Sequence, residues 1–284
     1  MRLLLGKEIA NNILAELMLE VTALREQGVI PKLALLMVGT DSGSQVYLEN
    51  AKRVAQKLGI DVLEQRFATD VLLQDLLTFV ENLNRDRRVH GILCQLPLPV
   101  GLTGDGEQRL VSTIDPNKDV DCVHPYNLGL LAMGRARLMP CTPHAVYQLL
   151  KRNNYQLSGK RVVIVGRSNI VGRPLSLILS TKGIDATVTL CHSRTPHEEL
   201  QRICKEADIL VVAMGKPKFI DKNFIRPGAV VIDVGTAQLA GQIVGDVDFA
   251  NVSELVAAIT PVPGGVGPLT RAMLMHNVVS AAKF

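Results

Sequence analysis

The stretch Arg161-Val-Val-Ile-Val-Gly166-Arg-Ser-Asn-Ile-Val-Gly172-Arg-Pro174 decides the fold of this chain. Its apolar run predicts a buried strand, its glycines a tight turn, and Pro174 suits a first helical turn, where a missing N–H costs little. Strand, glycine turn and helix in this order are typical of a dinucleotide-binding loop, because free N–H groups at a helix start favour a pyrophosphate. Ser168 and Val171 replace two glycines of the G-x-G-x-x-G pattern, so a plain structural turn is the alternative.

The end of the next predicted strand, Leu190-Cys191-His192-Ser193-Arg194-Thr195, favours NADP over NAD. No carboxylate stands there to bind a ribose 2′-hydroxyl, whereas Arg167, Ser193 and Arg194 could bind a 2′-phosphate. Asp185 precedes the strand and should lie at the opposite edge of the sheet. Solvated basic loop residues are the alternative interpretation. The predicted coenzyme-binding residues are Gly166, Arg167, Ser168, Val171, Gly172, Arg173, Pro174, His192, Ser193, Arg194, Ala213, Gly215, Lys216, Gly235 and Thr236.

Short apolar runs alternate with stretches of helical period along the whole chain, which predicts an α/β fold. We expect two domains, an N-terminal α/β substrate domain and a Rossmann-like NADP domain with a cleft between them. Their predicted bounds are 1–139 with 269–284, and 140–268. The predicted strands are 33–38, 60–67, 91–95, 161–165, 186–190, 209–213 and 229–234. The predicted helices are 7–27, 44–58, 72–84, 143–153, 172–181, 197–207 and 270–283, whereas 260–270 has too much Pro and Gly for regular structure.

The composition excludes several classes of protein. A hydrophobic fraction of 47% argues against a disordered chain, and a net charge of +4 with scattered basic residues argues against nucleic-acid binding. The apolar runs are too short to cross a membrane. Five cysteines without C-x-x-C spacing, and histidines without a metal-binding pattern, indicate neither a disulfide framework nor a metal site. We therefore expect a cytoplasmic protein with no nucleic-acid, membrane or metal partner.

Further motifs follow one another over nearly the whole chain. They are Val38-Gly-Thr-Asp-Ser-Gly-Ser-Gln-Val-Tyr47, Gly91-Ile-Leu-Cys-Gln-Leu-Pro-Leu-Pro99, Lys118-Asp-Val-Asp121, His124-Pro-Tyr-Asn127, Pro140-Cys-Thr-Pro143, Val231-Ile-Asp-Val-Gly235 and Thr260-Pro-Val-Pro-Gly-Gly-Val-Gly-Pro268. Together with the loop at 166–174, they resemble the methylenetetrahydrofolate dehydrogenase/methenyltetrahydrofolate cyclohydrolase family. The order of the motifs is the order of that family.

The resemblance implies a cytoplasmic, usually homodimeric enzyme of one-carbon metabolism and purine biosynthesis that binds tetrahydrofolate derivatives and NADP. It implies an oxidoreductase step, hydride transfer from 5,10-methylenetetrahydrofolate to NADP, and then a hydrolase step from the 5,10-methenyl cation to 10-formyltetrahydrofolate. By the same resemblance, Tyr47 stacks on the folate, Gln95 belongs to the catalytic centre and Asp121 binds the pterin. Leu96 and the backbone of Pro263, Gly264 and Gly265 complete the implied substrate site.

Each of these side chains has an ordinary structural alternative when it is taken alone. Tyr47 could be a core aromatic residue, Gln95 a polar residue at a strand end, and Asp121 a loop-capping carboxylate. The shared family context favours the functional interpretation. An amide beside a fixed carboxylate also suits a pterin, whose donors and acceptors need partners once they lose water.

One departure from the family affects the expected chemistry. The family has a catalytic lysine four residues after the tyrosine, and this chain has Ala51 there. Lys52 is the possible substitute, but one helical step turns a side chain by about 100°, so it should point away from Gln95. Hydride transfer depends mainly on positioning, whereas hydrolysis also needs proton movement and charge stabilisation. We therefore predict dehydrogenase activity with weak or lost cyclohydrolase activity.

Milder departures are Cys122, Ala145 and Thr236, where the family has glycine, glycine and isoleucine. Two alternatives to the predicted activity stay open. The first is a catalytically impaired relative that still binds folate and NADP. The second is another two-domain NADP enzyme, of the shikimate dehydrogenase kind, which would bind a small hydroxy acid and no folate.

Overall fold

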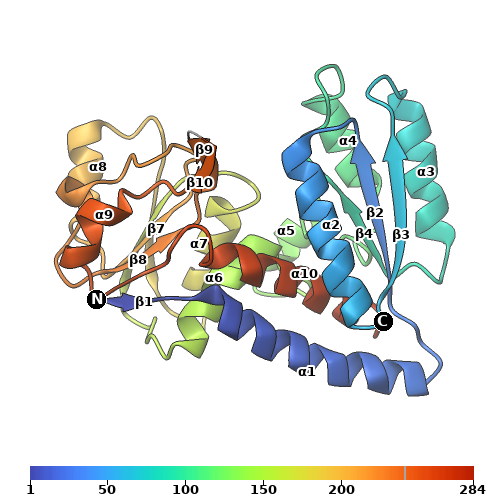
Figure 1. The fold of residues 1–284 in the computed structure, drawn as a ribbon, viewed down its shortest axis with the longest axis horizontal. Helices are drawn as coiled ribbons and strands as arrows, with labels where there is room; N and C mark the ends of the chain where they lie inside the picture. The colour runs from blue at the N-terminus through green and yellow to red at the C-terminus, as the bar shows by residue number, and fades with distance from the viewer. Residues whose placement is uncertain (240) are drawn as a thin grey trace. The chain divides into compact units, whose positions relative to one another are not determined.

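A computed structural model describes residues 1–239 and 241–284 of the chain, which form two compact units (Figure 1). Unit 1 consists of Met1–Asn11, Leu131–Arg135 and Thr142–Ala272. Unit 2 consists of Asn12–Leu130, Ala136–Cys141 and Met273–Phe284. Each unit has a parallel sheet covered by helices, as the alternating sequence pattern predicts. No helix in the described part of the chain has both the length and the apolar character that a membrane span requires.

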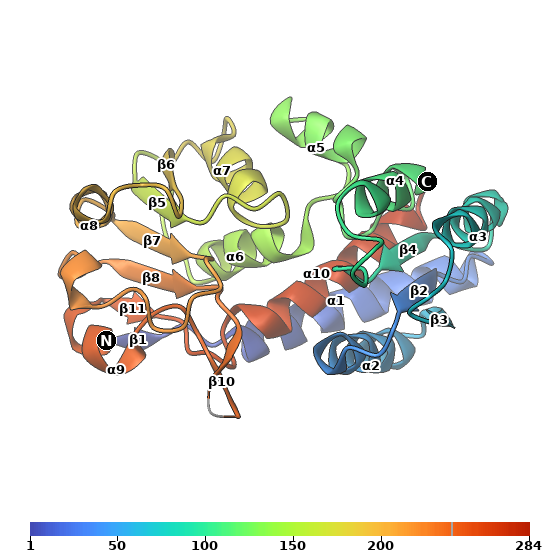
Figure 2. The same cartoon turned by 90° about the horizontal axis from the view of Figure 1, so that it is seen from above.

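Unit 1 contains a six-stranded parallel sheet, whose strands lie side by side in Figure 2. In spatial order the strands are β1 (Arg2–Leu3), β11 (Ala258–Ile259), β8 (Val230–Asp233), β7 (Ile209–Val212), β5 (Arg161–Val165) and β6 (Thr187–Cys191). The helices of this unit are α6 (Cys141–Arg152), α7 (Gly172–Ser180), α8 (His197–Cys204) and the short α9 (Phe249–Val252). A hairpin of β9 (Ala237–Leu239) and β10 (Gln242–Val244) follows β8.

Unit 2 contains a three-stranded parallel sheet in the order β3 (Asp61–Phe67), β2 (Lys32–Val38), β4 (Gly91–Cys94). Its helical elements are α1 (Gly6–Glu26), α2 (Ser42–Lys57), α3 (Leu73–Arg85), α4 (Asp105–Thr113), α5 (Pro125–Ala132) and α10 (Val266–Ala281), of which α1 and α10 have their first residues in unit 1. Buried residues of α3 at helical spacing, Leu76, Leu77, Val80 and Leu83, pack with β2 and β4 into the core.

The predicted strands and most predicted helices are confirmed to within a few residues. The irregular structure predicted for 260–270 is wrong in its second half, because α10 begins at Val266 rather than Thr270. Gly267 and Pro268 stand in the first turn, where the N–H that proline lacks would have no partner within the helix. The short helices α4, α5 and α9 and the strands β9, β10 and β11 were not predicted.

Asn277 on α10 is the main polar contact of this helix within unit 2. Its side chain is buried, and its Nδ2 donates to the carbonyl oxygens of Val120 and Met139, each at 2.8 Å. Val120 immediately precedes Asp121. The amide therefore fixes the segment that carries one of the predicted substrate residues.

Replacing Asn277 by leucine should lower the free energy of unfolding by about 2 to 3 kcal/mol, because two buried carbonyl groups lose a hydrogen-bond donor. Denaturant titration measures this change. The matched control is Asn12→Leu on the exposed side of α1, where the expected change is below about 0.5 kcal/mol. Equal effects of the two substitutions on the free energy of unfolding would contradict a stabilising role of the Asn277 hydrogen bonds.

Candidate active site

The carboxyl edge of the unit 1 sheet has the topology of a dinucleotide site. After β5 the chain forms β6 on one side of it and then returns to form β7 on the other side. The strand order therefore reverses beside β5, and in open α/β sheets ligands bind at the carboxyl ends of the strands at such a reversal. The loop at 166–172 follows β5 directly, so the predicted coenzyme loop lies at this point.

The glycines of this loop are required by close backbone contacts. Gly166 has a φ of 135°, and a Cβ atom there would lie 2.1 Å from the carbonyl oxygen of Ala213. A Cβ atom on Gly172, the first residue of α7, would lie 1.8 Å from the carbonyl oxygen of Gly166. Both distances are too short for a Cβ atom, so only glycine fits at these two positions without a shift of the backbone. The cradle at the start of α7 therefore fits a pyrophosphate, since backbone N–H groups can approach it without side chains in the way.

Two polar residues of the loop, Ser168 and Asn169, form hydrogen bonds that hold the turn and the start of α7 together. Ser168 Oγ accepts from the Val171 amide at 3.1 Å, and the Ser168 carbonyl accepts from the Arg173 amide at 3.1 Å. Ser168 thus closes the turn, although a glycine is common at this position of the G-x-G-x-x-G pattern. Arg173 donates to Asn169 Oδ1 at 2.9 Å.

The basic residues predicted to favour NADP lie beside this loop. The Gly166 amide donates to the Cys191 carbonyl at 2.9 Å, which places His192 next to the loop. The turn after β6 is closed by the His192 amide donating to Thr195 Oγ1 and by the Arg194 amide donating to His192 Nδ1. Arg167 and Arg194 are exposed. Asp185 lies before β6, at the amino edge, as predicted.

The turns after β7 and β8 are held by two buried aspartates. Asp246 Oδ2 accepts from the amides of Met214 and Gly215. Asp233 accepts through its two oxygens from the amides of Gly235, Asp246 and Val247. Burial, with some repulsion from Asp246, raises the pKa of Asp233 to about 6. The sequence analysis missed both carboxylates as organisers of the site, although Asp233 closes a predicted strand.

A pocket of about 220 Å³ at this edge combines two predicted sets of residues. The coenzyme positions Gly235 and Thr236 line it together with the substrate-loop residues Pro263, Gly264 and Gly265. Arg271, near the start of α10, also lines the pocket and was not predicted. The other predicted coenzyme positions at this edge, Ala213 and Lys216, follow β7.

In unit 2, Gln95 directly follows β4, and the segment that leads to Asp121 pairs with the same strand. Ile92 on β4 pairs in parallel with Asp119, and the chain then turns, since the Cys122 amide donates to the Asp119 carbonyl at 3.1 Å. Burial, with contributions from Asp119 and Asp121, raises the pKa of Cys94, the last residue of β4. The Gln95 amide donates to the Leu36 carbonyl at 2.9 Å, and its half-buried side chain donates to the Leu96 carbonyl at 3.0 Å. The action of Gln95 and Asp121 as a pair on a pterin stays a prediction.

The residues before Asp121 stabilise the backbone. Lys118 Nζ donates to the carbonyl oxygens of Leu83, Asn84 and Asp86 at 2.8 to 2.9 Å and so closes the end of α3. Asp119 is fully buried and accepts from the His124 amide and from Asn127 Nδ2. Lys118 and Asp119 thus have structural roles, and Asp121 is the carboxylate of this motif that remains available for a ligand.

The surroundings of Asp121 disfavour its charged form. Loss of water raises the pKa of the Asp121 carboxyl to about 6, and the neighbouring Asp119 adds to the shift. The Cys141 thiol interacts with the carboxylate and opposes the shift, whereas burial raises the pKa of Cys141 itself. All five cysteines are free. Among the described residues, no group of three or more His, Cys, Asp or Glu side chains could hold a metal ion.

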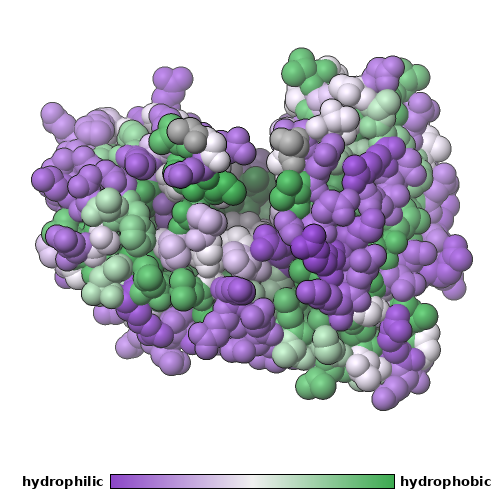
Figure 3. All heavy atoms as spheres, in the orientation of Figure 1, coloured by the Kyte–Doolittle hydropathy of each residue, from purple (hydrophilic) through white to green (hydrophobic). Residues whose placement is uncertain are grey.

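Helix α2 places Tyr47, Ala51 and Lys52. The helix begins after Asp41, whose side chain accepts from the Ser44 amide at 2.8 Å, and Tyr47 is half-buried in its second turn. Ala51 has no solvent exposure, and Leu48, Ala55 and Leu58 are buried along the same stripe. Hydrophilic side chains cover the outer side of α2 (Figure 3). Ala51 is therefore a packed helix residue.

Lys52 points toward β3 and not toward Gln95. Its Nζ lies 2.7 Å from Glu64 Oε2, and Arg66 binds the other oxygen of the same carboxylate. β3 and β4 lie on opposite sides of β2, so Glu64 and Gln95 stand about 10 Å apart across two strand spacings. The structure brings no other lysine of α2 to the position that Ala51 occupies, since Lys57 is exposed at the end of the helix.

The fold and these two sheet edges define a two-unit α/β protein with a dinucleotide-type sheet. Residues 4–121 match the family model for the tetrahydrofolate dehydrogenase/cyclohydrolase catalytic domain, and residues 140–284 match the model for the NAD(P)-binding domain of the same family. The chain belongs to the tetrahydrofolate dehydrogenase/cyclohydrolase family.

Individual relatives are similar to this chain over nearly their whole length. The chain is 46% identical to the bifunctional protein FolD of Acetivibrio thermocellus, over 99% of this chain and 97% of the relative. It is 46% identical to the FolD protein of Bacillus subtilis over 98% and 96%. Among solved structures, the bifunctional FolD of Campylobacter jejuni has a TM-score of 0.94 at 40% identity, covering 100% and 99% of the two chains. The Trypanosoma brucei enzyme, solved with NADP and an inhibitor, has a TM-score of 0.92 at 36% identity, covering 99% and 97%.

The glycine contact in the coenzyme loop gives a direct test. Gly172→Ala should weaken NADP binding at least tenfold, because its methyl group must displace the Gly166 carbonyl and with it the loop backbone. Quenching or enhancement of NADPH fluorescence measures the dissociation constant. Gly129→Ala on α5 is the control, since a Cβ atom there meets no other atom within 4 Å. Unchanged NADP affinity in Gly172→Ala would contradict the proposed cradle.

The shifted pKa of Asp121 gives a second test. The folded-state pKa, about 6, lies above the ordinary value of 3.8, so the folded protein binds more protons than the unfolded chain between about pH 4 and 6. The contribution of Asp121 to stability is therefore lost as the pH rises through this window. Between pH 4 and pH 7, the free energy of unfolding of Asp121→Asn should rise by about 2 to 3 kcal/mol relative to that of the wild type.

Denaturant titrations at several pH values measure this difference. The wild type and Asp121→Asn both retain the similar contribution of Asp233, so the comparison isolates Asp121. Asp70→Asn, at an exposed turn, is the control and should follow the wild type across the whole range. A constant difference between wild type and Asp121→Asn would show that the Asp121 pKa is not raised.

Proposed function

We propose that this chain oxidises 5,10-methylenetetrahydrofolate to 5,10-methenyltetrahydrofolate with NADP, and that its cyclohydrolase activity is weak or lost. The main observation in support is the fully buried Ala51 on α2, with Lys52 bonded to Glu64. Relatives named as bifunctional enzymes are 45 to 48% identical over nearly the full chain, which supports the dehydrogenase part.

The two ligands are assigned to different parts of the chain. Residues 1–139 with 269–284 form the proposed folate-binding domain, in which Tyr47 stacks on the substrate while Gln95, Leu96 and Asp121 contact the pterin. Residues 140–268 form the proposed NADP-binding domain. There the loop at 166–174 takes the pyrophosphate, and Arg167, Ser193 and Arg194 take the 2′-phosphate. Pro263, Gly264 and Gly265 provide backbone contacts to the substrate.

Bound NADP supplies the carbon that accepts the hydride. The protein itself contributes position and electrostatics. Gln95 and Asp121 hold the pterin, and the turns fixed by Asp233 and Asp246 hold the backbone of Met214 and Gly235 in one arrangement. Positioning of this kind can supply several kcal/mol of the barrier reduction without any general acid or base.

Charge explains why the two activities separate. Hydride loss makes the substrate a cation, and an ionised Asp121 stabilises that developing charge. Hydrolysis consumes the same cation and needs a group that moves protons at the attacking water. Ala51 offers no such group. Electrostatic preorganisation in this chain therefore favours oxidation over hydrolysis.

Homodimer formation, a cytoplasmic location and a role in the one-carbon supply for purine biosynthesis are further parts of the proposal. They are supported by membership of the family, to which the bifunctional FolD proteins of Acetivibrio thermocellus and Campylobacter jejuni belong. A catalytically impaired protein that binds both ligands is the second candidate function, and it too is favoured by Ala51. The assay below separates the two.

Wild-type protein supplied with methylenetetrahydrofolate and NADP should accumulate methenyltetrahydrofolate, seen by its absorbance, at the rate at which NADPH forms. Methenyl compound that disappears much faster than in enzyme-free buffer would contradict the loss of cyclohydrolase activity. Absence of NADPH formation, with both ligands still bound, would support the impaired relative instead.

Ala51→Lys should raise the rate of methenyl hydrolysis by about 100-fold or more, because a positioned proton-transfer group typically contributes 10² to 10⁴. The long stem of lysine can extend from a buried Cβ toward solvent, and thermal unfolding shows whether the variant folds. Lys52→Met is the matched control, since it removes a lysine of the same helix that is bonded to Glu64. It should leave both rates unchanged.

A further inference from the structure

Arg271 places a cationic side chain in the pocket at the carboxyl edge of unit 1. It is the sixth residue of α10, and its side chain is half-buried. The pocket, of about 220 Å³, is also lined by Gly264 and Gly265 of the proposed substrate loop and by Gly235 and Thr236 of the proposed coenzyme edge. A guanidinium group therefore stands where both ligands are expected to be recognised.

No acidic group neutralises Arg271 within residues 1–239 and 241–284. The side chain has neither an ion pair nor a hydrogen bond there, and α10 contains no aspartate or glutamate. Asp233 also lines the pocket, but its oxygens accept three backbone N–H groups, from Gly235, Asp246 and Val247. Thr236, the remaining polar side chain of the turn after β8, is neutral.

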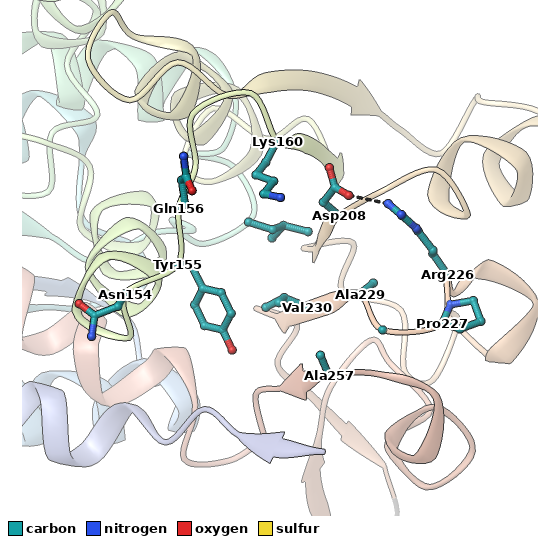
Figure 4. A pocket seen from close by; sticks show the side chains of 12 residues that line it. Asn154, Tyr155, Gln156, Lys160, Asp208, Arg226, Pro227, Ala229, Val230 and Ala257 are labelled. Carbon is teal, nitrogen blue, oxygen red and sulfur yellow. Dashed lines mark hydrogen bonds and ion pairs between the residues drawn. The ribbon is translucent and has the colours of Figure 1, made fainter.

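A second pocket in the same unit shows the opposite arrangement (Figure 4). It lies at the amino ends of β5, β7 and β8, away from the loop at 166–172, and it also contains an arginine. There Arg226 forms an ion pair with Asp208, whose carboxylate additionally accepts from the Arg161 amide. Arg226 is thus neutralised inside the protein, whereas Arg271 is not.

A half-buried guanidinium has lost part of its hydration and has five N–H donors to satisfy. Its planar fork matches a carboxylate or a phosphate, which can accept two parallel hydrogen bonds. We propose that Arg271 binds an anionic group, a carboxylate or a phosphate, of a ligand that occupies this pocket, and so determines specificity. The proposal rests on the proposed function, because tetrahydrofolate and NADP are the ligands that bring such groups.

Two sources of the anion are distinguished by direct binding measurements on the full chain. Isothermal titration is carried out with tetrahydrofolate, with tetrahydropteroate, which lacks the glutamate carboxylates, and with NADP. Arg271→Met should weaken binding of either tetrahydrofolate or NADP by about tenfold or more, the effect of losing a charged hydrogen bond. Loss for tetrahydrofolate but not for tetrahydropteroate assigns the glutamate carboxylate, and loss for NADP alone assigns a coenzyme phosphate.

Arg271→Lys should recover part of the lost affinity, because it keeps the charge but not the fork. Arg87→Met, at an exposed position of unit 2, removes the same charge from the surface and should leave every dissociation constant within about twofold. Thermal unfolding of both Arg271 variants shows that they fold. Unchanged affinity for both tetrahydrofolate and NADP in folded Arg271→Met would overturn the proposal.

The same measurements separate this proposal from the proposed function. A wild type that binds both ligands without forming NADPH would contradict the dehydrogenase assignment and still test Arg271 through the dissociation constants. A wild type that forms NADPH, with an Arg271→Met variant of unchanged affinity, would contradict only the role of Arg271. A wild type that binds neither ligand would overturn both.

Discussion

Backbone N–H groups at the end of a parallel strand have no partner within the sheet, and in unit 1 two buried carboxylates accept them. Asp246 serves the turn after β7, and Asp233 serves the turn after β8 together with the backbone of Asp246 and Val247. Removing either carboxylate would leave buried N–H groups without acceptors. The shape of the carboxyl edge, and with it the proposed ligand site, therefore depends on these two side chains.

Placing two carboxylates close together in the interior has an electrostatic cost. Asp246 has no solvent exposure, Asp233 has almost none, and the pKa of Asp233 is raised to about 6. Hydrogen bonds from backbone N–H groups to these carboxylates offset part of this cost, because such bonds favour the charged form of a carboxyl group. Asp119 has the same role in unit 2, where its bonds to the His124 amide and Asn127 fix the loop that carries Asp121. Each sheet edge thus uses one class of buried carboxylate for architecture and leaves other groups open for ligands.

The sequence predicts the parts of this architecture that depend on local pattern. The strands β2 to β8, the glycine loop and the position of Asp185 follow from apolar runs, glycines and strand ends, and all of them are confirmed. The predicted start of α10 is wrong because Pro and Gly usually break a helix but are tolerated in its first turn. Asp246 and Arg271 could not be found in this way, since their partners or pocket neighbours lie up to 38 residues away in the sequence and nothing local marks them. The assignment of Tyr47, Gln95 and Asp121 came from the family resemblance, and their roles stay predictions. The structure adds that the segment before Asp121 pairs with β4, the strand that Gln95 follows.

In the proposed function, Ala51 at the position of the family's lysine bears on the charge that a substrate would meet at Asp121. The pKa of the Asp121 carboxyl is set by burial, by the charge of Asp119 and by the Cys141 thiol. Neither of these two neighbouring groups is a cation. A lysine ammonium in this region would stabilise the ionised carboxylate and at the same time oppose a positive charge on the bound folate. Without it, the carboxylate becomes a stronger partner for the cation that oxidation produces. Under the proposed function, Ala51 would therefore remove a group that serves hydrolysis and improve the electrostatic conditions for hydride transfer, so the two proposed activities need not decline together.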